Sequence, residues 1–206
     1  LGYSSHGLAT GDISGDGLVD LVAGAPFDST QGPGGGAVYG FTSTQAKGLS
    51  ANYKKIFNSA GNKDDNFGYS VAVGNFDGDR QSSIPLNDIA VGALNEESLR
   101  YGGGALHVFL SGALAQPQPL PSVRSNSDLV LYDTDATVQN YRNETTRIVG
   151  DINGDGYDDA VGHMTRMDSS GQSVTDAVIY FGSPNGLITT TFCLNNPSKV
   201  FKSGQA

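Results

Sequence analysis

Residues 151–159, with the sequence DINGDGYDD, carry oxygen-bearing side chains at loop positions 1, 3, 5 and 9: Asp151, Asn153, Asp155 and Asp159. Ca²⁺ prefers such oxygen ligands and takes about 6–8 of them in a flexible geometry. The backbone carbonyl of Tyr157, at position 7, and water would complete the shell. Gly156, at position 6, permits the sharp turn that such a loop needs. The stretch therefore predicts a calcium-binding loop.

The residues after this loop exclude an EF-hand. An EF-hand places a bidentate Glu at position 12, where this chain has Gly162. The loop is followed by the small apolar run Ala160-Val161-Gly162, which is typical of a strand entering a core. We therefore place the loop between two antiparallel strands.

The same loop begins twice upstream. The first copy offers side chains at the same four positions and a backbone carbonyl at position 7: Asp12, Ser14, Asp16, Asp20 and Leu18. The second copy offers Asn75, Asp77 and Asp79, but its closing Asp88 comes late, after an insertion at residues 80–86. We expect Ca²⁺ in the first and last loops, and a third ion if the irregular second loop also binds.

The alternative for all three loops is an Asp/Gly-rich turn without metal, because such turns are common. Three occurrences at matching spacing favour calcium, in a structural role that ties a hairpin turn. Mg²⁺ is disfavoured because it demands strict octahedral geometry and retains its waters.

The charge of the chain agrees with this interpretation. The formal net charge is −9, and nine of the 21 acidic residues lie in the loops: Asp12, Asp16, Asp20, Asp77, Asp79, Asp88, Asp151, Asp155 and Asp159. Without metal, each cluster should repel itself and loosen its hairpin. An acidic chain is a poor partner for nucleic acid or an anionic membrane, and no apolar run predicts insertion into a bilayer.

Composition favours an all-β fold. Glycine is abundant, with 29 of 206 residues, and short runs rich in Val, Ile, Tyr and Phe lack helical periodicity. Cys193 is the single cysteine, which excludes an internal disulfide and leaves a buried thiol or an intermolecular bridge. With no initiator Met or signal peptide, the chain is expected to be an excised or processed piece.

The flanks of the loops repeat as well. Each unit contains a strand, the loop, a second strand, a Gly-rich turn and a third strand, with fourth strands expected at residues 54–58, 128–132 and 188–192. Four antiparallel strands per roughly 60 residues form the blade of a β-propeller. The units are predicted at about 1–60, 61–135 and 136–206, and the proline-rich stretch around Pro117, Pro119 and Pro121 as a long loop.

The motifs Phe67-Gly68 and Gly24-Ala25-Pro26, together with the aspartate loops, resemble the FG-GAP repeats of the integrin α-subunit propeller. The match weakens at residues 1–4 (LGYS), 92–94 (GAL) and 162–164 (GHM). The resemblance implies a propeller of about seven blades, of which this chain accounts for about three, the others lying on absent sequence or another chain. It also implies a non-enzymatic adhesion module, extracellular or at the cell surface, that binds a protein ligand or partner subunit.

The resemblance further implies that ligands dock on the face away from the calcium loops. Residues 28–31 and 95–101 form longer, more varied loops, of the kind in which binding is usually found. One alternative is a non-catalytic accessory propeller of an extracellular hydrolase, similar to the glycosylphosphatidylinositol-specific phospholipase D. Another is a sugar-binding propeller, in which Tyr39, Tyr101 and Tyr157 would replace the absent Trp as stacking residues.

No catalytic constellation is recognisable. His6, His107 and His163 lack metal-ligand spacing and pair with no nucleophile in sequence, and His107 is expected to be a satisfied structural histidine. The Gly-rich stretches 32–36 and 102–104 lack the Lys-Ser/Thr of a phosphate loop. The sequon at Asn143 mildly supports secretion and would mark an exposed segment. We expect no enzymatic activity.

Overall fold

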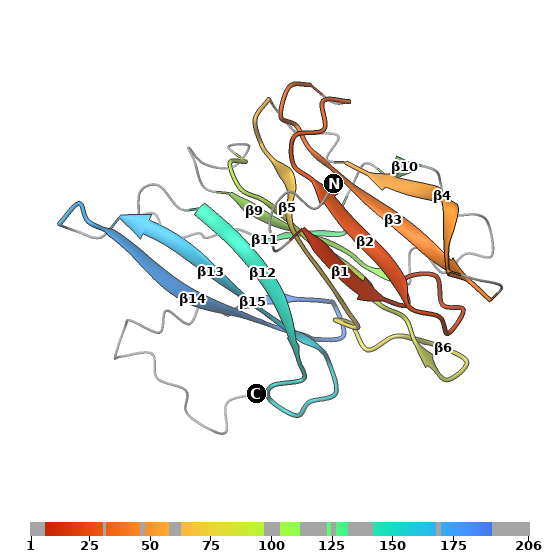
Figure 1. Ribbon diagram of the computed structural model, residues 1–206. Coiled ribbons are helices and arrows are strands. Elements are labelled where there is room, and N and C mark those ends of the chain that lie inside the picture. The colour runs from red at the N-terminus through yellow and green to blue at the C-terminus, as the bar shows by residue number, and fades with distance from the viewer. Residues whose placement is uncertain are drawn as a thin grey trace.

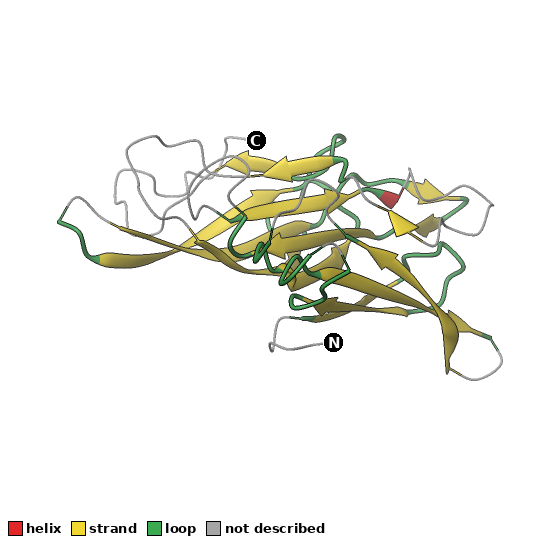
Figure 2. Ribbon diagram, turned by 90° about the horizontal axis from the view of Figure 1, so that it is seen from above, coloured by secondary structure: helices red, strands yellow, loops and turns green. Residues whose placement is uncertain are grey.

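The computed structural model describes residues 7–30, 32–45, 48–57, 63–96, 104–111, 123–124, 127–131, 142–167 and 170–190. These residues form strands and contain no α-helix, so the predicted all-β class is confirmed. Three mainly antiparallel sheets lie side by side (Figure 1) and are stacked in layers when seen from above (Figure 2). Each sheet is one blade of a propeller, and we name them the first, second and third blade in chain order.

The first blade follows the order of the chain. Its four main strands are β1 (Leu8–Gly11), β2 (Asp20–Ala25), β3 (Ala37–Thr44) and β4 (Gly48–Ile56). A fifth strand, β10 (Val123–Arg124), pairs in parallel with β4 although it comes after the third strand of the next blade. The sequence did not predict this strand, because two residues are too few to show a periodic pattern.

The second and third blades repeat the antiparallel arrangement. The second consists of β5 (Phe67–Gly74), β8 (Asp88–Ala93), β9 (Ala105–Phe109) and β11 (Leu129–Leu131). The third consists of β12 (Arg142–Gly150), β13 (Asp159–Met167), β14 (Ser173–Phe181) and β15 (Ile188–Thr190). The fourth strands predicted from the sequence therefore correspond to β4, β11 and β15.

Two hydrophobic clusters hold the three blades together. The cluster between the first and second blades includes Val22, Val38, Phe67 and Phe109, all fully or almost fully buried. The cluster between the second and third blades includes Ala90, Leu106, Val108, Val178 and Tyr180. Because both faces of the second blade are covered, β8 and β9 are buried along their whole length, and their residues are apolar apart from Asp88 and His107.

The FG and GAP motifs meet where the first two blades touch. Gly68, after the buried Phe67, has φ +88°, and a Cβ there would overlap the carbonyl oxygen of Ala37. A Cβ on Gly24 would in turn overlap the carbonyl oxygen of Gly68. Glycine is needed at both positions because the two backbones approach too closely for any side chain. The glycines of the two motifs therefore allow the backbones of neighbouring blades to pack in direct contact.

Candidate calcium sites

The three aspartate loops occupy the same place in their blades. Each connects the first strand to the second, and the glycine before the loop pairs with the closing Asp after it: Gly11 with Asp20, Gly74 with Asp88 and Gly150 with Asp159. All three loops therefore lie at the same end of the sheets (Figure 1).

The closing Asp side chains are buried and share two hydrogen bonds from equivalent positions, and Asp20 also accepts the N–H of Ser14 at 3.1 Å. Asp20 is 1% exposed, and Asp88 and Asp159 are 0% exposed. One oxygen of each accepts the N–H of loop position 2, from Ile13, Phe76 and Ile152 at 3.1, 2.7 and 2.7 Å. The other accepts an N–H at the end of the third strand, from Ser43, Ser111 and Gly182 at 2.7, 2.7 and 2.9 Å. Each closing Asp thus ties its loop to two strands.

Burial raises the pKa of all three closing carboxyls, against the lowering effect of these N–H donors. The shift is largest for Asp88, whose pKa rises to about 7 through burial and the nearby charge of Asp77. A cation beside a buried carboxylate in this position would favour its charged form.

In the first and third loops the Asp at position 1 organises the turn. Asp12 accepts the N–H groups of Gly15, Asp16 and Gly17 at 2.7, 3.2 and 2.7 Å. Asp151 accepts those of positions 4, 5 and 6 in the same way, at 2.7, 3.0 and 2.9 Å. Position 6 has φ +83° at Gly17 and +94° at Gly156, which explains its glycine. Both loops are therefore folded as compact turns.

The remaining predicted ligands of these two loops lie at the surface. Ser14, Asp16, Asn153 and Asp155 are exposed, whereas Leu18 and Tyr157, the position-7 residues, are partly buried. Asp16 and Asp155 each accept the N–H of the position-7 residue, at 2.9 and 3.0 Å. Among the described residues, neither of these loops brings three carboxylates together as closely as the second loop does.

The second loop compensates for its insertion with a small hairpin. Strands β6 (Arg80–Gln81) and β7 (Ile84–Pro85) pair with each other, and Leu86 N–H closes the hairpin on the Asp79 carbonyl at 3.2 Å. The chain therefore leaves the loop at Asp79 and returns to it almost at the same point. Asp88 takes the place that Asp20 and Asp159 take in the other loops.

The second loop has the geometry of a cation site. One carboxylate oxygen from each of Asp77, Asp79 and Asp88 lies within 4.8 Å of the other two. Two oxygens bound to one Ca²⁺ at about 2.3–2.6 Å lie at most about 5 Å apart, so the three fit one ion. Asn75, 8% exposed, donates from its side-chain amide to the Asp79 carbonyl at 3.0 Å, while its buried Oδ1 has no hydrogen-bond partner. These residues fit Ca²⁺.

The pKa of Asp79 is also raised. Burial, with the Asp77 charge beside it, raises that pKa, although Ser111 Oγ donates to the Asp79 carboxylate at 3.3 Å. A cation between these carboxylates would relieve the repulsion. The sequence indicated the candidate ligands of this loop but not that it would be the most enclosed of the three.

His107 is a satisfied structural histidine, as predicted. It is 3% exposed; its Nε2 lies 2.5 Å from Glu96 and its Nδ1 lies 3.1 Å from Ser127 Oγ. Its ring packs edge-on against Phe67 at 5.3 Å between centroids. Both ring nitrogens are engaged inside the blade interface, so the group stabilises the second blade.

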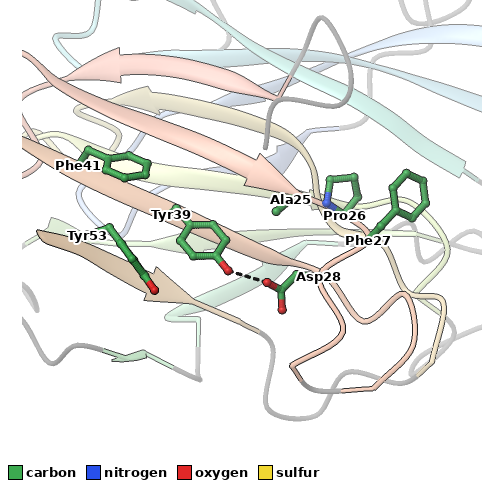
Figure 3. Close-up of a pocket in the computed structure, with 7 residues that line it drawn as sticks. All are labelled: Ala25, Pro26, Phe27, Asp28, Tyr39, Phe41 and Tyr53. Carbon is green, nitrogen blue, oxygen red and sulfur yellow. Dashed lines mark hydrogen bonds between the residues drawn. The ribbon is translucent and has the colours of Figure 1, made fainter. Parts of the chain in front are cut away.

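The first blade has a corresponding polar pair in an open groove of about 630 Å³ (Figure 3). Tyr39 Oη donates to Asp28 at 2.5 Å, and Lys55 Nζ lies 2.9 Å from the same carboxylate. Burial alone would raise the pKa of Asp28, but hydrogen bonds from Thr30, Tyr39 and Lys55 hold it well below its usual range. Neither Glu96 nor Asp28 was singled out from the sequence as part of such a pair.

The groove also contains Phe41, Tyr53 and the exposed Phe27 (Figure 3). In the first blade, Tyr39 and Phe41 of β3 pair with Ala23 and Leu21 of β2. In the second blade, His107 and Phe109 of β9 occupy the equivalent positions and pair with Val91 and Ile89 of β8. In the second blade this face is covered by the first blade. The groove is therefore the corresponding face of the first blade, which no other blade covers within the described part of the chain.

Of the predicted sugar-stacking residues, Tyr39 lies in this groove, beside the end of β2 that is away from its loop, and Tyr157 lies against Gly78 of the second loop. Tyr39 and Tyr157 therefore do not belong to one stacking surface. The described residues do not include Tyr101, Cys193, His6, residues 1–4 or the three prolines. Of the predicted binding loops, Gln31 and residues 97–101 are also outside the described part of the chain. Asn143 lies in β12, where only the backbone is described.

In the described part of the chain, no helix is long and apolar enough to span a bilayer.

Comparison with known proteins agrees with the architecture. A family model described as FG-GAP repeat matches residues 6–41, which contain β1, the first loop, β2 and the first part of β3. Integrin alpha-PS2 of Drosophila melanogaster is 29% identical over 215 residues, an alignment that covers 98% of this chain. The chain spans 13% of the length of that relative. Together with the blades and the FG to GAP contact, these matches support an integrin α-like chain built of FG-GAP repeats.

Proposed function

We propose that this chain is a calcium-stabilised, non-enzymatic recognition module of the cell surface or extracellular space that binds a protein ligand or partner subunit. The observation that carries the calcium part is the convergence of Asp77, Asp79 and Asp88 beside the unpartnered Oδ1 of Asn75. The recognition part rests on the similarity to an integrin α subunit.

The second loop would hold Ca²⁺ with Asn75, Asp77, Asp79 and Asp88. The first and third would use Asp12, Ser14, Asp16, the Leu18 carbonyl and Asp20, and Asp151, Asn153, Asp155, the Tyr157 carbonyl and Asp159. Bound Ca²⁺ would supply positive charge that offsets carboxylate repulsion. The closing Asp carboxylates would then hold the first, second and third strands of each blade together through the N–H groups already described.

Native mass spectrometry of the full chain tests the calcium part. We expect two to three Ca²⁺ ions per chain at about 1 mM free calcium and loss of all of them in excess EGTA. An Asp88→Ala variant should bind one ion fewer, because the second loop loses a buried ligand. A chain that carries no calcium would contradict the proposal.

Attachment of cells to surfaces coated with the full chain tests the recognition part. Attachment in calcium that disappears in EGTA and on the Asp88→Ala surface supports a calcium-dependent protein-binding module. A chain that binds calcium yet supports no attachment would contradict the recognition part and favour an accessory propeller.

A further inference from the structure

The calcium loops of successive blades are joined by reciprocal hydrogen bonds. Asn87 stands directly before the closing Asp88 of the second loop. Its backbone N–H donates to the Asp12 carbonyl at 3.1 Å, and its Oδ1 accepts the Asp12 backbone N–H at 2.8 Å. Asp12 is position 1 of the first loop, so a residue of the second blade holds the first ligand residue of the first blade on both sides of its backbone.

The same arrangement joins the second and third blades. Asp158, directly before the closing Asp159, donates its backbone N–H to the Asn75 carbonyl at 3.0 Å. Its Oδ2 accepts the Asn75 backbone N–H at 2.9 Å. Asn75 is position 1 of the second loop. Two independent blade contacts therefore use the same register, with an Asn in one and an Asp in the other.

A second contact reinforces the junction of the second and third blades. The Tyr157 ring lies so close to Gly78 that a Cβ there would be 2.7 Å from Tyr157 Cε1. Gly78 is position 4 of the second loop and has φ +74°. The third loop thus contacts the second at two of its positions, one of them the candidate ligand with the unpartnered oxygen.

We infer that Asn87 and Asp158 are positioning residues that complete the calcium site of the preceding blade, so that calcium affinity in one loop depends on the packing of the next blade. This inference rests on the proposed calcium function. The physical reason is that a ligand side chain is oriented by what holds its own backbone, and partners outside the ligand shell typically change metal affinity about 10–100-fold. By linkage, calcium in one loop stabilises its contact with the following blade to the same extent.

The first loop supplies a matched control at the equivalent position. The residue before its closing Asp20 is Val19, which is 64% exposed and has no side chain that could accept a hydrogen bond. Val19→Ala therefore changes the same loop position without touching a neighbouring blade. Asn87→Asp is the conservative variant, because it keeps an acceptor oxygen and reproduces the residue found in the third loop.

The test is a calcium titration of the ¹⁵N-labelled full chain, followed by NMR at the amides of Gly17, Gly78 and Gly156, which report the three loops separately. Asn87→Ala should raise the calcium concentration for half-saturation at Gly17 about tenfold and leave Gly156 unchanged. Asp158→Ala should do the same at Gly78. Val19→Ala should move none of them, and Asn87→Asp should restore Gly17 to within about threefold of the wild type.

A purely structural blade contact would give a different result. Asn87→Ala would then lower the melting temperature equally in calcium and in EGTA and leave half-saturation at Gly17 unchanged, which would overturn the inference. An effect confined to Gly78, the loop to which Asn87 belongs in sequence, would also overturn it. Failure of the proposed function looks different again, because the wild-type chain would then show no calcium response at any of the three glycines.

Discussion

The second loop and its two neighbours satisfy the requirements of a cation site in opposite ways. The first and third loops keep the regular spacing, but their ligand side chains at positions 3 and 5 are exposed, and their position-1 carboxylates are turned onto backbone N–H groups. The second loop has lost the spacing, yet its three carboxylates converge beside a buried amide oxygen without a partner.

The difference teaches that the closing carboxylate, rather than the interval in sequence, defines the site. Asp20, Asp88 and Asp159 are all buried and accept N–H groups from the same two positions of their blades, although Asp88 comes after an insertion. An insertion is tolerated when it folds on itself and returns the chain to its starting point, as β6 and β7 do. The predictions below test whether enclosure or regularity determines the strength of each site.

The largest effect is expected for Asp88→Ala. The substitution leaves the N–H groups of Phe76 and Ser111 without an acceptor and removes a proposed calcium ligand, so urea unfolding in calcium should show a loss of roughly 3–5 kcal/mol. Asp16→Ala, at an exposed position of the first loop, serves as the control and should cost under about 1.5 kcal/mol. Equal losses for both variants would show that enclosure does not matter.

The next prediction distinguishes a calcium ligand from a structural carboxylate by comparing how its substitution changes stability in EGTA and in calcium. Asp79 lies among like charges that help to raise its pKa, so Asp79→Ala should stabilise the chain slightly in EGTA and destabilise it by about 2 kcal/mol in calcium. Asp155 is exposed, and Asp155→Ala should be nearly neutral in EGTA and cost about 1 kcal/mol in calcium. Melting curves in both conditions give the comparison; equal destabilisation in calcium and EGTA would argue against metal in either loop.

Restoring the regular spacing of the second loop should have a smaller effect. Deleting residues 81–85 and changing Arg80 to Gly leaves a loop of the same length and turn as the other two. If the hairpin only returns the chain to its starting point, calcium affinity at Gly78 should change less than about threefold. Loss of calcium binding in this variant would show that the hairpin is part of the site.

Asp88 also predicts a dependence of stability on pH. A buried carboxyl whose folded pKa is raised, like that of Asp88 at about 7, binds a proton more tightly in the folded than in the unfolded chain. In EGTA this group therefore contributes stability that is lost as the pH rises from about 4 to about 7, at up to about 1.4 kcal/mol per pH unit. Calcium competes with that proton, so the calcium-induced rise in melting temperature should be larger at pH 8 than at pH 6.

The Asp88→Asn variant provides the control for that measurement. It removes the titrating group and should flatten the dependence in EGTA. An unaltered pH dependence in Asp88→Asn would mean that this carboxyl does not titrate in the range given.

Much of the fold follows from local sequence. The loop positions, the flanking apolar runs and the repeated units predicted four-stranded blades, and β4, β11 and β15 appear where fourth strands were expected. The FG and GAP motifs indicated the family, and the overlap that a Cβ on Gly24 or Gly68 would cause explains why those positions require glycine.

What the sequence could not supply are contacts between distant segments. The two residues of β10 pair with β4 across a separation in sequence that no periodic pattern spans. Asn87 and Asp158 have no local signal either, because their partners Asp12 and Asn75 belong to other blades. The sequence likewise marked the second loop as the least regular, whereas the folded hairpin makes it the one in which three carboxylates converge.

The most direct test of the calcium account is thermal unfolding of the full chain in about 1 mM Ca²⁺, about 1 mM Mg²⁺ and excess EGTA. A single site with a dissociation constant of about 10 μM would add about 2.7 kcal/mol at that calcium concentration, which corresponds to a rise of roughly 5–10 °C. The account predicts at least such a rise in calcium and little change in magnesium. Identical melting curves in all three conditions would contradict it.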